Sequence, residues 1–192
     1  MTAGSASSPN PPVAPILVLG LGNMLLGDDG VGPALVERLA EEYADLQAGA
    51  ADELAADMLK ASTSQIEFLD GGTQGLALLG QLAHRQALVI IDALDTGQSP
   101  GTVSVLEGRQ VMTMSCERSS SAHESNATEL LAVAALLGDL PETFYLIGVQ
   151  PAVVKTSIGL SVEVQRSLDG AVQKARDLID PLLMEFTQAL SA

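Results

Sequence analysis

Two adjacent carboxylates, Asp28 and Asp29, lie in a glycine-rich segment, residues 20–32, that directly follows the apolar run 16–19. Glycines allow a backbone to turn sharply and to approach a ligand closely. In an open α/β sheet, a loop beyond the carboxyl end of a strand borders the binding crevice. One of the carboxylates could cap the helix predicted from Val31 onward, but the two together favour a bound cation.

The same glycines permit a second interpretation, a dinucleotide site. Gly20 and Gly22 match the first two glycines of the dinucleotide fingerprint, whereas Leu25 stands at the third position. An acidic loop would also repel a pyrophosphate. The cation site is therefore the favoured interpretation.

Asp70 and His123 are the other candidates for this site. Asp70 begins a second acidic glycine loop, after the apolar run 66–69, and His123 precedes a helical pattern. Loops that follow parallel strands open on one edge of the sheet, so Asp29 and Asp70 can approach each other. Two carboxylates and one imidazole suit a divalent transition metal and leave coordination positions open. We predict that Asp29, Asp70 and His123 form one metal-contacting set, with an exposed loop histidine as the alternative for His123.

Asp92 and Asp95 also follow a predicted strand on this edge, but loop capping and turn formation account for them. His84 is interpreted as structural, at the end of a helix. The lone Cys116 excludes an internal disulfide, which fits a reducing compartment. A nucleophilic role for Cys116 would need a base and an orienting group that the sequence does not identify.

Alternating strand and helix patterns must position these residues. Apolar runs predict strands near 16–19, 66–69, 87–91, 102–106 and 144–149, with helical spacing after 31, 76, 129 and 161. Pro181 is expected to kink or end the last helix, and residues 108–122 receive no assignment. The pattern predicts a three-layer α/β/α fold with a mostly parallel, twisted sheet of about five strands.

The domain organisation follows from composition. Residues 1–15 are rich in Ser, Pro and Ala and are predicted to form a disordered tail. Residues 16–192 are predicted to form a single α/β domain, in which the Ala-, Asp- and Ser-rich segment 44–64 is a helix-containing insertion.

The net charge of −15 restricts the partners, because the chain has only 9 Lys and Arg against 24 Asp and Glu. Nucleic acids and anionic membranes require a basic surface, so neither is expected as a partner. No apolar run has the length of a membrane span. We therefore expect a soluble, cytoplasmic protein whose partner is a metal cation or a protein.

Three segments together resemble the hydrogenase maturation endopeptidases. They are G-x-G-N and D-[DE]-G-x-G within residues 20–32, L-D-G-G-T at 69–73, and Ser121-Ala122-His123. The resemblance extends from about residue 16 to about residue 179, although Asn126 stands where the family commonly has glycine. By this resemblance, Asp29, Asp70 and His123 match the metal-contacting acid, aspartate and histidine of the family.

The resemblance implies an aspartyl-type endopeptidase that removes a C-terminal extension from the large-subunit precursor of a nickel–iron hydrogenase. Nickel would arrive with the substrate and serve in its recognition, and other divalent metals are expected to occupy the site in vitro. The alternative is a non-catalytic chaperone or binding module that recognises the nickel site, since the sequence has no serine-protease, cysteine-protease or H-E-x-x-H signature.

Overall fold

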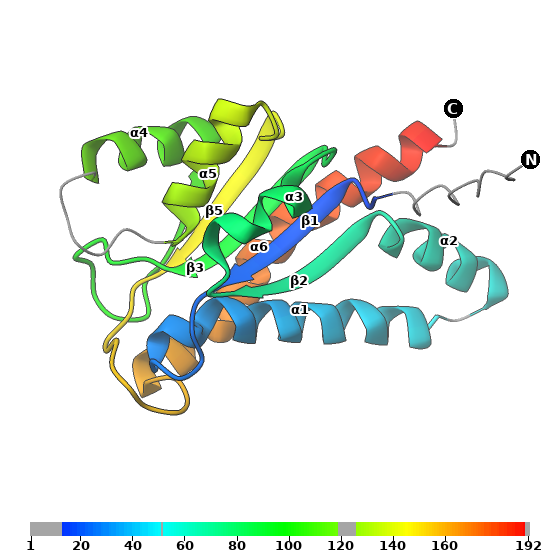
Figure 1. Ribbon diagram of the computed structural model, residues 1–192. Helices are drawn as coiled ribbons and strands as arrows, with labels where there is room; N and C mark the ends of the chain where they lie inside the picture. The colour runs from blue at the N-terminus through cyan, green and yellow to red at the C-terminus, as the bar shows by residue number, and fades with distance from the viewer. Residues whose placement is uncertain (1–12, 51, 119–125, 191–192) are drawn as a thin grey trace, which may run out of the picture.

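A computed structural model describes residues 13–50, 52–118 and 126–190 of the chain (Figure 1). Its sheet has five strands: β1 (Ile16–Leu21), β2 (Ile66–Gly72), β3 (Ala87–Ala93), β4 (Val103–Glu107) and β5 (Thr143–Val149). The strand order is β2-β1-β3-β5-β4. All neighbouring pairs are parallel except β4 and β5. The prediction of a mostly parallel sheet is confirmed.

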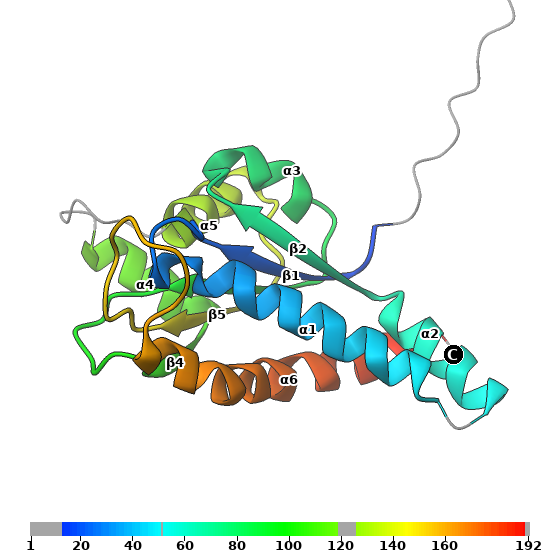
Figure 2. The ribbon, with the colours of Figure 1, turned by 90° about the horizontal axis from the view of Figure 1, so that it is seen from below.

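Helices cover both faces of this sheet, as Figure 2 shows from below. The residues of β1 alternate between the faces: Ile16 and Val18 belong to one buried cluster, and Leu17, Leu19 and Leu21 to the other. The first cluster also contains residues of α1 (Val31–Ala48) and α6 (Val162–Leu190). The second contains residues of α3 (Leu79–Leu82), α4 (Gly108–Arg118) and α5 (Asn126–Leu137). This is the predicted three-layer α/β/α fold.

The segment 44–64 contains the end of α1 and a separate helix, α2 (Glu53–Thr63). The side chain of Gln47 donates a hydrogen bond to the Thr63 hydroxyl, and Thr187 Oγ1 on α6 lies 3.3 Å from Ser62 Oγ. The helical content was predicted correctly, and these contacts attach α2 to both α1 and α6.

Of the two expectations for Pro181, a kink or an end of the helix, the structure excludes the end, because helix α6 continues through Pro181 to Leu190. Leu182 and Leu183 are buried just after the proline, and their packing offsets the backbone hydrogen bond that proline removes. Residues 13–15 of the predicted tail belong to the described part of the chain, and there Arg85 Nη1 donates to the Ala14 carbonyl at 2.7 Å. Residues 1–12 lie outside the described residues.

The strand order identifies where a binding crevice should lie. After β1 the chain crosses to β2 on one side and then to β3 on the other, so the order reverses between β1 and β3. In doubly wound α/β sheets, ligands bind beyond the carboxyl ends of the strands at such a reversal. β2 is an edge strand and is separated from β3 by β1. Within the described ranges, no helix is both long and apolar enough to cross a membrane.

Candidate active site

The loop after β1 holds Asp29 in a tight backbone turn. Asp29 Oδ2 accepts a hydrogen bond from the Asn23 amide at 2.8 Å, and Asn23 Oδ1 accepts one from the Leu25 amide at 2.9 Å. Gly22 has φ +128°, and a Cβ there would lie 1.8 Å from the Asp29 carbonyl oxygen. Only glycine allows this close approach. The turn leaves the Asp29 side chain half-buried, beyond the carboxyl end of β1.

The neighbouring Asp28 is fully buried and has a different role. Its carboxylate accepts hydrogen bonds from the backbone amides of Ala152, Val153 and Ser161 at 2.8, 3.0 and 2.6 Å. Burial by itself would raise the pKa of Asp28, but these hydrogen bonds, led by that from Ser161, keep the pKa below its usual value. Asp28 therefore attaches the β1–α1 loop to the β5–α6 loop. Neither aspartate caps α1, whose N-cap is Gly30 without a side-chain hydrogen bond.

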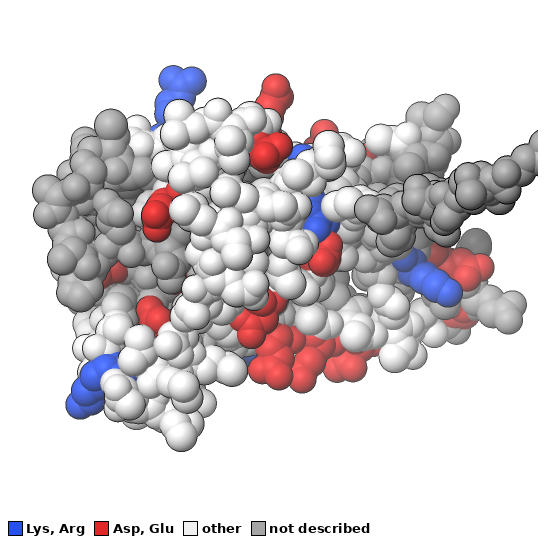
Figure 3. Space-filling view, in the orientation of Figure 1, with Lys and Arg blue, Asp and Glu red and all other residues white. Residues whose placement is uncertain are grey.

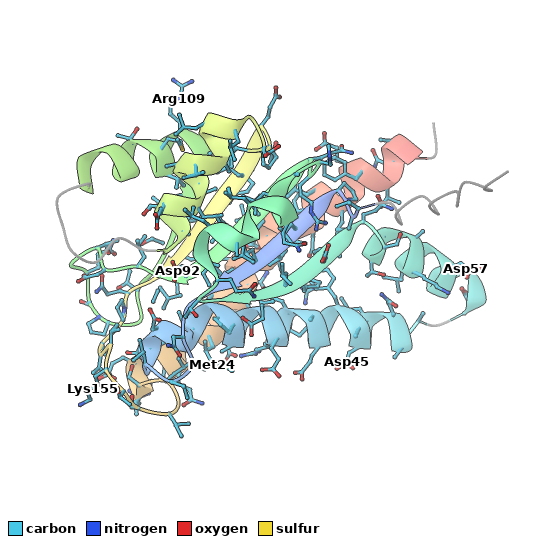
Figure 4. The ribbon with its side chains drawn as sticks, in the orientation of Figure 1. Met24, Asp45, Asp57, Asp92, Arg109 and Lys155 are labelled. Atoms are coloured by element: carbon cyan, nitrogen blue, oxygen red, sulfur yellow. The ribbon has the colours of Figure 1, made fainter. Side chains whose placement is uncertain are left out.

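Asp92, near the end of β3, is the functional candidate that the sequence analysis missed (Figure 4). It is 3 % exposed, and the backbone N–H groups of Ala93 and Ala127 donate to its carboxylate. Its Oδ2 atom has no hydrogen-bond partner among the described residues. Burial, followed by the negative charge of Asp29, raises the pKa of Asp92 to about 7.

The capping and turn interpretation holds for Asp95, whose Oδ1 accepts from the Gly97 amide at 3.1 Å. For Asp92, the hydrogen bonds from the Ala93 and Ala127 amides are of the capping and turn kind, but they leave Oδ2 buried and unpaired beside a second carboxylate. Such an oxygen is expected to take up a proton or a cation. The sequence signal was an acid directly after the apolar run 87–91, but its importance depended on the strand order.

Asp70 lies on the edge strand β2, where it pairs with Gly20 of β1. Its side chain is exposed, and Oδ1 accepts from the Gly72 amide at 2.9 Å, a local turn contact. In the part of the chain that the structure describes, no group of three or more His, Cys, Asp or Glu side chains could hold a metal ion. The predicted set of Asp29, Asp70 and His123 remains a prediction, since His123 lies outside the described residues.

The neighbours of His123 along the chain are nevertheless located. Residues 119–125 connect α4 to α5, and the Ala127 amide at the start of α5 donates to Asp92. Ala127 follows His123 by four positions in the sequence, and four residues span at most roughly 14 Å. The backbone of Cys116 belongs to α4.

Fold and site together define a doubly wound α/β protein with two interacting carboxylates, Asp29 and Asp92, at the β1–β3 reversal of strand order. A family model described as hydrogenase maturation protease matches residues 34–178. The chain belongs to this family, and it is a peptidase.

Curated relatives and solved structures agree with this assignment. The chain is 33% identical over 165 residues to the hydrogenase expression/formation protein HupD of Thiocapsa roseopersicina, covering 85% of this chain and 67% of that protein. It is 31% identical over 160 residues to the hydrogenase 2 maturation protease of Escherichia coli, covering 83% and 87%. The structure matches the hydrogenase maturating endopeptidase HybD from E. coli with a TM-score of 0.68 at 27% identity, over 86% and 92% of the two chains. The [NiFe] hydrogenase maturation protease HybD from Thermococcus kodakarensis matches with a TM-score of 0.61 at 27% identity, over 85% and 98%.

Proposed function

We propose that this peptidase removes the C-terminal extension of a nickel–iron hydrogenase large-subunit precursor and recognises the nickel that the precursor carries. The names of the relatives support a hydrogenase as the substrate. The observation that carries the proposal is the buried, unpaired Oδ2 of Asp92 beside the charge of Asp29. A cation bound between these carboxylates would compensate for the burial and the repulsion that raise the pKa of Asp92.

The donor set suits a divalent transition metal. Asp29 and Asp92 supply carboxylate oxygens, and His123, which the backbone can bring near Asp92, supplies an imidazole nitrogen. This proposal gives Asp92 the place that the sequence analysis predicted for Asp70, because β3 lies at the crevice and β2 at the sheet edge. Three protein ligands leave positions for groups of the precursor, so tight contact depends on nickel already held by the substrate.

Cleavage requires an attacking water and a group that moves its proton. A carboxylate can accept a proton from the attacking water and return it to the leaving amine. Within the Asp29–Asp92 pair, a carboxylate oxygen that does not contact the metal would accept this proton. Aspartyl-type cleavage by this pair is the chemistry that we propose.

Mass spectrometry of purified nickel-loaded and nickel-free precursor, before and after incubation with the peptidase, tests this function. We expect loss of a C-terminal peptide from the loaded precursor only. Asp92→Asn is expected to abolish cleavage, Asp70→Asn to retain most of it, and Asp45→Asn on the exposed face of α1 to retain all of it.

Each other outcome has a definite meaning. Equal cleavage of both precursors would contradict nickel recognition, and tight binding without cleavage would support the chaperone alternative. Loss of activity in Asp70→Asn with retention in Asp92→Asn would restore the originally predicted set. Inactivation by a cysteine-directed inhibitor would assign the nucleophile to Cys116.

A further inference from the structure

Two loops at the carboxyl edge of the sheet present apolar side chains to solvent. Met24 and Leu25, in the β1–α1 loop, are 57% and 63% exposed. Val154 and Ile158, in the β5–α6 loop, are 54% and 93% exposed. Single exposed apolar residues are common, but a group of them on adjacent loops typically marks an interaction site. We call residues 23–27 and 153–160 together the loop platform.

Backbone hydrogen bonds join the two halves of the loop platform. The Gly27 amide donates to the Ser157 carbonyl, and the Ser157 amide donates to the Leu25 carbonyl, both at 3.1 Å. The buried Asp28 adds its own amide bond to the Val153 carbonyl at 3.1 Å and its three carboxylate contacts to the β5–α6 loop. Figures 1 and 2 both show the two loops side by side. A surface ordered in this way loses little conformational entropy when a partner binds.

The charge of the loop platform differs from that of the whole chain. Lys155 is the one charged residue in its sequence, although the chain carries a net charge of −15. Figure 4 labels Lys155 and Met24 of the loop platform, in the lower left part of the view. In the same orientation, Figure 3 shows this part of the surface as white with one basic side chain, whereas acidic side chains gather along α1. An apolar partner segment without net positive charge fits this surface, because a basic segment would be attracted to α1 instead.

The loop platform is also continuous with the active site. The amide of Asn23 donates to Asp29, and the side chain of Asn23 holds the Leu25 amide, so one short turn carries both the site carboxylate and the exposed Met24–Leu25 pair. A second copy of this chain bound there would cover the edge of the site and would bring two strongly acidic proteins together. A segment of the substrate itself has neither of these disadvantages.

We infer that the loop platform docks an apolar segment of the precursor beside the bond to be cut. This inference rests on the proposed function and adds to it a second contact, separate from the nickel. The metal contact reports whether nickel is present, and the loop platform distinguishes the precursor from other nickel proteins.

The test compares Leu25→Asp/Ile158→Asp with the control Leu136→Asp, which changes a side chain that is 87% exposed near the end of α5. With nickel-loaded precursor, the double variant should raise KM at least about tenfold with little change in kcat, because it removes the burial of two apolar side chains. The control should keep the wild-type KM. The milder Leu25→Ser/Ile158→Ser should shift KM in the same direction, and thermal unfolding of every variant verifies folding.

Direct binding of the precursor, measured by calorimetry, separates this inference from the proposed function. If wild type binds the precursor but does not cut it, the function fails, while weaker binding by the double variant still supports docking. An unchanged KM and unchanged binding in the folded double variant would overturn the inference, as would an equal loss in Leu136→Asp. A wild-type dimer that the double variant dissociates, with KM unchanged, would show that the surface joins two copies instead.

Discussion

At the scale of single residues, Asp92 is a carboxylate that the fold holds at an energetic cost. Its pKa is raised from 3.8 to about 7, so the folded state binds a proton that the unfolded state has already released. The free energy of unfolding should therefore fall by up to about 4 kcal/mol as the pH rises from about 4 to about 7. Above that pH it should stay level.

Asp92→Asn should remove this pH dependence, because an amide does not titrate in this range. Urea unfolding at several pH values, in the presence of a chelator, measures how the free energy of unfolding depends on pH. Asp45→Asn is the control, because its side chain is exposed and the substitution should leave this pH dependence unchanged. Parallel curves for wild type and Asp92→Asn would mean that Asp92 does not carry the raised pKa. If Asp92→Asn is more stable than wild type but does not cleave the precursor, the carboxylate serves function at the expense of stability.

Asp28 should behave in the opposite way. Its pKa is lowered in the folded state, so its contribution is fully present above the unfolded value of 3.8 and is lost as the pH falls through the folded value. Asp28→Asn should cost about 2–4 kcal/mol at neutral pH, because a neutral amide cannot accept from all three backbone N–H groups as a carboxylate does. Urea unfolding at neutral pH measures the loss in the free energy of unfolding. The same measurement at acidic pH should show the values for wild type and Asp28→Asn converging. A loss below about 0.5 kcal/mol would contradict the loop attachment that we assign to Asp28.

At the scale of elements, the end of β2 separates two roles of glycine. Glycines in an Asp-Gly-Gly turn commonly serve backbone geometry, which fits Gly72, with φ +49°. Gly71 differs, because a Cβ there would lie 2.8 Å from the side chains of both Leu19 and Leu78. Gly71 thus leaves space for core packing.

Substitution by Asn distinguishes these roles, because Asn tolerates left-handed backbone whereas overpacking affects any side chain. Gly72→Asn should change the free energy of unfolding by less than about 1 kcal/mol, and Gly71→Asn should cost about 1–3 kcal/mol. Thermal unfolding measures the stability of both Asn variants, and of Gly71→Val and Gly72→Val in parallel. Equal losses in the two Asn variants would show that both positions serve the same purpose.

At the scale of the whole molecule, metal binding should depend on pH. A cation at the site must displace the proton of Asp92, whose pKa is about 7. Calorimetric titration with Ni²⁺ should show affinity falling at least about tenfold from pH 8 to pH 6. Asp92→Asn should lose most of the affinity at both values. Affinity that is independent of pH would contradict a site built from Asp92.

Much of the architecture could be predicted because its signals are local. Runs such as 87–91 are apolar throughout, which is typical of strands buried on both faces, and the helical spacing after Val31 marks a face on the sheet. The position of Asp29 after the first strand and the motifs that identify the family are local as well. Pro181 shows the limit of such signals, since burial of Leu182 and Leu183 overrides the tendency of proline to end a helix.

The sequence by itself determined the fold class, the family and the acidic loops that follow the strands. Only the tertiary structure decided which acids meet, because strand order and register come from contacts between distant segments. That order brings Asp92 to Asp29 and leaves Asp70 on the edge strand. It also buries Asp28 against backbone amides of residues 152–161, more than a hundred positions away, while its neighbour Asp29 stays half-buried and acts on Asp92. Identical side chains at adjacent positions therefore have different roles, because the charge on each is stabilised by whatever the fold places around it.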